Sequence, residues 1–151
     1  MRLLALALLL LTPACDATKR EARLETRAVR RESRQLSEIA ELYWRALRWQ
    51  DIGVVAGFIE DGDRRLRWMN EAAQELGAYR YRSVEVMRVE IGPALEADPE
   101  GHLREARVLV QVQGYRVDEQ VIRQELLVQE WYRSGAGWFV VPGFETGSAV
   151  E

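Results

Sequence analysis

The chain has few residues of the kinds that build metal sites or covalent cross-links. It contains one cysteine and one histidine in 151 residues, so no disulfide can form within the chain. His102 stands in a loop bounded by proline and glycine residues, where a solvated side chain is expected rather than a ligand. No Gly-x-Ser-x-Gly, Walker or dinucleotide-binding motif occurs. We therefore expect no metal and no cofactor.

A large excess of one charge is also missing, and so is a long apolar run. The net charge of −3 is too small to argue for a nucleic-acid partner. The segment Leu3–Leu11 consists only of leucine and alanine, but a helix that spans a membrane needs about 20 apolar residues. Hydrophobic residues make up 48% of the chain, which is enough for one domain with a packed core.

The N-terminus has the pattern of a bacterial secretory signal. Met1-Arg2 gives a positive start, Leu3–Leu11 an apolar region, and Ala14 a small residue before Cys15. The segment Leu11–Cys15 resembles the lipobox of bacterial lipoproteins, with Thr12 where that motif usually has leucine. The resemblance implies cleavage before Cys15 and diacylation of its thiol with fatty acids such as palmitate. Two acyl chains hold a protein on a membrane without a spanning helix.

Two other interpretations of Cys15 stay open. Cleavage after Ala17 would release a soluble secreted protein, and a cytoplasmic protein could bury Cys15 as a free thiol. If Cys15 is lipidated, the domain faces the periplasm of a Gram-negative cell. Asp16 resembles the signal that retains lipoproteins at the inner membrane in enteric bacteria, and the outer membrane remains an alternative.

The charge changes sign along the mature chain. Residues 16–36 carry seven basic and four acidic side chains, whereas residues 37–151 carry thirteen basic and twenty acidic ones. The basic segment is either an arm beside anionic head groups, or a solvated tether or helix extension with paired charges. The predicted parts are a signal peptide (1–14), a lipidated basic tether (15–36), an α+β domain (37–142) and a flexible tail (143–151).

Helical periodicity dominates the first half of the domain. Apolar residues recur at helical spacing at five positions, Leu36, Ile39, Ala40, Tyr43 and Leu47. We expect Asp51 to cap a second, short helix, and Asp63 to cap a third helix that ends at Gly77.

From Tyr79 the apolar period changes to two, which indicates strands. A phase slip at Val86-Met87 predicts a β-bulge in the first strand. The second strand alternates cleanly over 106–113, the third covers 120–133, and a turn at 134–137 leads into a fourth at 138–141. The predicted fold is α+β, with N-terminal helices packed on one face of a four-stranded antiparallel sheet.

Residues 36–142 resemble the nuclear-transport-factor-two-like superfamily of cystatin-like cones. The segment Tyr43–Asp51, followed by a short apolar helix, is similar to the opening of that family. The final hairpin, Glu130–Arg133 with Trp138–Val140, is similar to its end. The resemblance implies a curved sheet. The superfamily includes cyclases, isomerases, dehydratases, assembly scaffolds and proteins without chemistry, so the fold alone leaves the function open.

Enzymes of this superfamily carry an acidic residue or a histidine inside the cone. The polar strand residues that could take this place are Glu85, Glu90, Gln124 and Glu130. Alternation puts Glu130 on one face with four other residues, Ile122, Leu126, Val128 and Tyr132. A carboxylate among them could act as a general base. Alternatively, Glu130 pairs with Arg88 or Arg107 across the sheet, or lies at its rim.

The leading interpretation is a non-enzymatic envelope module that binds another protein or itself. The alternatives are a pocket for a small apolar ligand, lined by some of the aromatic residues, and an enzyme of cyclase or isomerase type. If residues 106, 108, 110 and 112 pack on the helices, the other phase of the strands faces outward. We expect this outer face, with Leu109, Leu127 and Trp131, to contact a second copy or an envelope protein.

Overall fold

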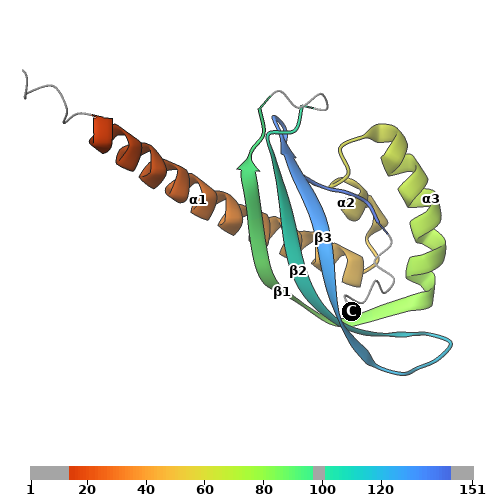
Figure 1. Ribbon diagram of the computed structural model, residues 1–151. Coiled ribbons are helices and arrows are strands. Elements are labelled where there is room, and N and C mark those ends of the chain that lie inside the picture. The colour runs from red at the N-terminus through yellow and green to blue at the C-terminus, as the bar shows by residue number, and fades with distance from the viewer. Residues whose placement is uncertain (1–13, 97–100, 144–151) are drawn as a thin grey trace, which may run out of the picture. The chain divides into compact units, whose positions relative to one another are not determined.

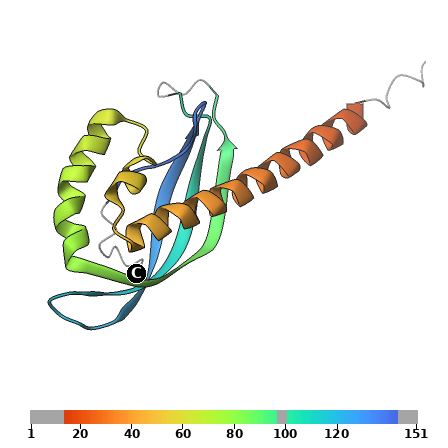
Figure 2. The ribbon, with the colours of Figure 1, turned by 180° about the vertical axis from the view of Figure 1, so that it is seen from behind.

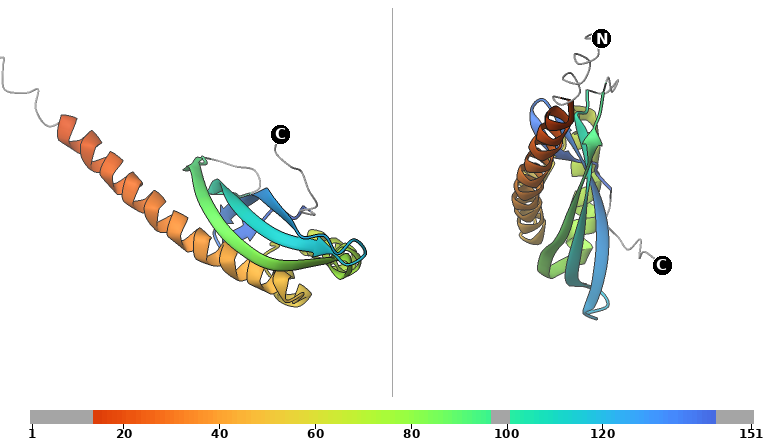
Figure 3. Two further views of the ribbon diagram at one scale, coloured as in Figure 1. Left: turned by 90° about the horizontal axis from the view of Figure 1, so that it is seen from below. Right: turned by 60° about the vertical axis from the view of Figure 1, so that its left-hand side comes forward.

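The computed structural model describes residues 14–96 and 101–143 (Figure 1). In this part of the chain three helices precede four strands, and the strands form one antiparallel sheet in the order β1-β2-β3-β4. The elements are α1 (Ala14–Arg48), α2 (Ile52–Ala56), α3 (Gly62–Ala78), β1 (Tyr79–Ala94), β2 (Arg104–Arg116), β3 (Arg123–Ser134) and β4 (Gly137–Val140). The sheet is curved and does not close on itself (Figure 3). The predicted α+β architecture is confirmed.

The described residues divide into two compact units, the first ending at Glu32 and the second beginning at Ser33. In the first unit the described residues belong to α1, and the side chains of Arg20–Arg31 are exposed except for half-buried Val29. The basic segment is therefore helical where it is described. The second unit begins at Ser33 and contains Leu36, which is completely buried.

The starts of the two shorter helices follow the usual chemistry of N-caps. The carboxylate of Asp51 accepts a hydrogen bond from the backbone N–H of Val54 at 3.1 Å, as predicted for α2. The prediction that Asp63 caps α3 is wrong, because the cap is Asp61, which accepts from the backbone N–H of Arg64 at 2.6 Å. Asp61 has the extended backbone that a cap needs, whereas Asp63 already lies in the first helical turn.

The third helix passes directly into the sheet. It runs one residue beyond Gly77, the predicted end, and Tyr79 is already extended. In β1 the predicted bulge is confirmed: Val86 pairs with Val110 and Arg88 with Leu109, which leaves Met87 without a partner in the register. The extra residue restores the phase, so the apolar residues of β1 on both sides of Met87 lie against the core.

The predicted phase of β3 is wrong. Leu127, Gln129 and Trp131 pair with Val110, Val108 and Ala106 of β2, and directly paired residues lie on the same face of a sheet. Leu127 and Trp131 are therefore buried on the inner face, together with Gln129. We call the face opposite the helices the outer face of the sheet.

Aromatic side chains fill the space between the inner face and residues 33–48, the part of α1 that belongs to the second unit (Figure 2). Tyr43 contacts the rings of Phe58 and Trp131 edge to face, each at 5.7 Å between centroids. Trp44 contacts Tyr81 in the same way at 5.6 Å. Such pairs stabilise a core beyond the area they bury.

A buried amide links two of these tryptophans. Gln129 Oε1 accepts hydrogen bonds from Trp44 Nε1 at 3.1 Å and from Trp131 Nε1 at 3.0 Å, and its side chain is almost completely buried. One amide oxygen therefore satisfies two indole N–H groups from α1 and β3.

We expect Gln129→Leu to lower the free energy of unfolding by about 2–4 kcal/mol, because it leaves two buried N–H donors without an acceptor. Gln124→Leu is the matched control on an exposed position of β3, and it should change the value by less than about 0.5 kcal/mol. Denaturant titration followed by circular dichroism measures both. A Gln129→Leu variant as stable as the wild type would contradict the role of the amide.

Candidate functional site

The polar residues considered for chemistry do not enter the interior. Glu85, Glu90, Gln124 and Glu130 all have exposed side chains. The prediction that Glu130 lies within a buried apolar set is wrong, because that phase of β3 forms the outer face. Glu130 is the register partner of Arg107, and Arg107 is that of Glu90, so Glu130 lies beside Arg107 across the sheet.

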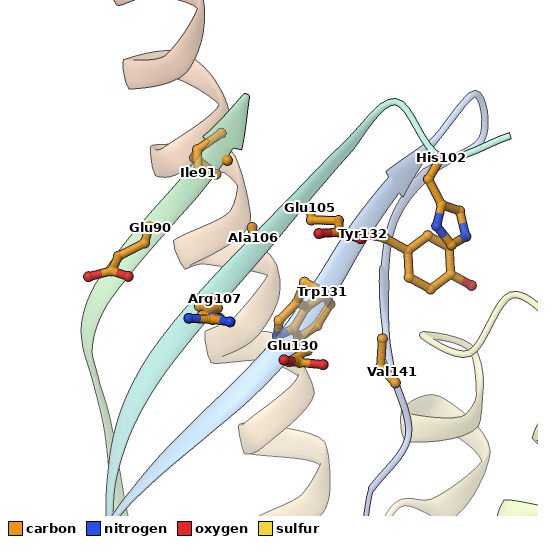
Figure 4. Close-up of a pocket in the computed structure, with 11 residues that line it drawn as sticks. Glu90, Ile91, His102, Glu105, Ala106, Arg107, Glu130, Trp131, Tyr132 and Val141 are labelled. Carbon is orange, nitrogen blue, oxygen red and sulfur yellow. The ribbon is translucent and has the colours of Figure 1, made fainter. Parts of the chain in front are cut away.

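A depression of about 390 Å³ lies at this row of charges. Figure 4 shows the side chains of Glu90, Arg107 and Glu130 on three neighbouring strands. Arg88 Nη2 lies 3.0 Å from Glu90 Oε1, and both side chains are more than half exposed. Exposed ion pairs of this kind contribute at most about 1 kcal/mol to stability. The row of Glu90, Arg107 and Glu130 therefore adds little to the stability of the fold, and it is available to contact polar groups of a partner.

The far end of the depression is aromatic. The His102 ring stacks on the Tyr132 ring at 4.0 Å between centroids (Figure 4). Burial raises the pKa of the Tyr132 hydroxyl, and the charge of Glu60 and its hydrogen bond to Tyr132 raise it further. Glu60 also accepts a hydrogen bond from Ser134 Oγ at 2.6 Å. Tyr132 consequently stays neutral at physiological pH and is a hydrogen-bond donor rather than a base.

Within residues 14–96 and 101–143, no three His, Cys, Asp or Glu side chains are placed to hold a metal ion. His102 is half-buried against Tyr132, whereas the sequence favoured a solvated side chain. The stacking partner is thirty residues away in the chain, so local sequence around His102 gives no indication of it.

Apolar side chains gather in the middle of the outer face. Leu109 pairs with Val128, and Leu126 pairs with the neighbouring Gln111. Leu126 and Val128 are 49% and 47% exposed, and Leu109 is half-buried. We call Leu109, Leu126 and Val128 the outer cluster. Of the three residues predicted here, Leu109 is on the outer face, whereas the placement of Leu127 and Trp131 there is wrong.

Sequence reasoning missed Leu126 and Val128 as surface residues and Gln129 as an interior one. Period-two alternation gives β3 two acceptable phases, because both carry large apolar residues. The pairing of β3 with the well-defined β2 would have identified the correct phase.

Models of protein families, curated proteins and solved structures were all searched, and none matches the chain. No helix in the described part of the chain is both long and apolar enough to cross a membrane. All but the last residue of the predicted signal peptide lies outside the described residues, and Cys15 falls in the first turn of α1.

Proposed function

We propose that this protein is a lipid-anchored module of the bacterial envelope that binds protein through the outer face of its sheet. The outer cluster is the observation that carries the proposal. It leaves large aliphatic side chains in water on a sheet whose other face is occupied by helices. Contiguous exposed apolar groups on an otherwise polar surface are typical of contact sites.

The surroundings of the outer cluster support a protein partner. The flanking residues are half-buried or exposed glutamines and charged groups of both signs, namely Gln111, Gln113, Gln124, Arg88, Arg107, Glu90 and Glu130. An apolar centre within a polar rim is the usual composition of a non-obligate interface. Charges of both signs also allow a second copy, related by a two-fold axis, to pair acidic with basic groups. We therefore favour self-association.

The interior gives less support to the two alternatives. A pocket for an apolar ligand would need space where Tyr43, Trp44 and Trp131 pack against one another. A cyclase or isomerase would need an acid or base in that interior, and the four polar strand residues considered above are exposed instead. The membrane part of the proposal rests on Leu3–Leu11 and Cys15 in the sequence.

Disulfide trapping tests the contact in the intact, membrane-bound protein. Because Cys15 is expected to carry lipid, Gln111→Cys introduces one free thiol beside the outer cluster. On mild oxidation of isolated membranes, we expect this variant to form a covalent dimer. Leu66→Cys is the matched control, since Leu66 is 61% exposed on α3, and it should remain monomeric.

Adding Leu126→Glu to Gln111→Cys should reduce the trapped dimer by more than about tenfold, because a charge would be buried at the centre of the contact. Non-reducing gels measure the dimer in all variants. Equal trapping at positions 111 and 66 would contradict self-association through the outer face.

A further inference from the structure

One edge of the sheet is open. β1 pairs with β2 on one side and with no strand of the described chain on the other (Figure 1). The register of β1 is shifted between Tyr81 and Ser83 and again between Val86 and Arg88. Residues 83–86 are therefore a short regular edge between two irregularities. Backbone N–H and C=O groups on such an edge can form hydrogen bonds with another extended chain.

A groove lies between this edge and the C-terminal half of α1. Its volume is about 400 Å³. Val84 and Val86 line it from β1, and their side chains belong to the inner, apolar phase of that strand. Trp44 of α1 borders the groove but is only 1% exposed, so the half-buried Val84 and Val86 supply its accessible apolar surface, and Arg45 and Arg48 line it from the helix.

The helix wall of the groove is mainly cationic near the end of α1. Arg45 and Arg48 are three residues apart, so they lie on neighbouring turns of one helix face, and both are exposed. Glu41 is one turn earlier. Glu85, the other carboxylate at the groove, pairs in register with Gln111 and so points to the outer face. The groove thus offers apolar surface from Val84 and Val86 and, at one end of its helix wall, two cations.

We propose that an extended peptide segment of a partner protein adds a strand to the free edge of β1. Its backbone pairs with residues 83–86, and an apolar side chain opposite Val84 or Val86 points to the inner side of the strand and packs on these valines. An acidic side chain on the same face of the peptide lies opposite Arg45 and Arg48. An exposed strand edge beside a helix-walled groove combines main-chain hydrogen bonds with pockets for alternate side chains, which is how strand addition achieves affinity and specificity.

Defined peptides test this with the full chain in detergent micelles. The probes are fluorescent eight-residue peptides in which threonine alternates with valine, with aspartate or lysine replacing one central valine. We expect the aspartate peptide to bind with a Kd on the order of 10–100 μM and the lysine peptide about tenfold more weakly. Two N-methylated versions of the aspartate peptide complete the test, one methylated at the odd-numbered and one at the even-numbered amides. We expect one version to lose binding and the other to keep it, because only every second peptide amide faces β1.

Charge reversal tests the same groove from the protein side. Arg45→Glu with Arg48→Glu should invert the preference, so that the lysine peptide binds better. Arg67→Glu, an exposed arginine of α3, is the control and should leave the preference unchanged. The peptides should also bind the Leu126→Glu variant, because Leu126 belongs to the outer cluster and not to the groove. This variant therefore distinguishes the two proposed contact sites. Equal binding of the two peptides, or insensitivity to N-methylation, would overturn the proposal.

Discussion

Trp131→Ala is expected to lower the free energy of unfolding by about 3–5 kcal/mol, because it removes a large buried side chain and leaves a cavity in the core. Trp131 is 1% exposed, contacts Tyr43 and Phe58, and donates a hydrogen bond to Gln129. The loss should exceed that of any single surface substitution.

Trp49→Ala provides the matched control, since it removes the same side chain at a position that is 74% exposed. Its main described contact is with the guanidinium of Arg48, at 5.9 Å from the ring centroid, so we expect a change below about 1 kcal/mol. Denaturant titration followed by circular dichroism compares the two variants. If both unfold at the same denaturant concentration, Trp131 is not in the core and the phase of β3 described above is incorrect.

Cys15→Ser is expected to abolish both the incorporation of fatty acid and the retention of the protein in membranes. Each buried methylene contributes about 0.8 kcal/mol and stable anchoring takes two chains. Because Cys15 is the only cysteine in the sequence, its replacement removes the only thiol that a lipoprotein pathway could acylate, and the loss should be complete. Metabolic labelling with palmitate in a bacterial host, followed by separation of membranes, measures both effects.

Asp16→Asn is the control at the neighbouring residue. It should keep the label, although it could change the membrane in which the protein is found. Label that persists after Cys15→Ser would contradict lipidation at this residue. A wild-type protein that is secreted without label would instead support cleavage after Ala17.

The sequence by itself determined the local structure wherever its residue pattern is compatible with only one arrangement. The alternation over 106–113 has one apolar and one mainly polar phase, so the buried face of β2 follows directly, with residues 106, 108, 110 and 112 inside. The bulge at Met87 follows from an apolar phase that slips by one residue. The cap of α2 at Asp51 needs only a carboxylate within reach of an amide three residues on.

Tertiary structure alone decided the features for which local patterns allow two answers. The pair Leu126-Leu127 makes either phase of β3 acceptable in the sequence, and only pairing with β2 selects the one that buries Leu127, Gln129 and Trp131. The phase of β3 decides which of its side chains lie on the outer face, and the proposed function depends on that face. The choice of phase could not be made locally because a one-residue shift moves every side chain of a strand to the other face, and the free energy that distinguishes the two phases comes from packing against residues distant in the chain.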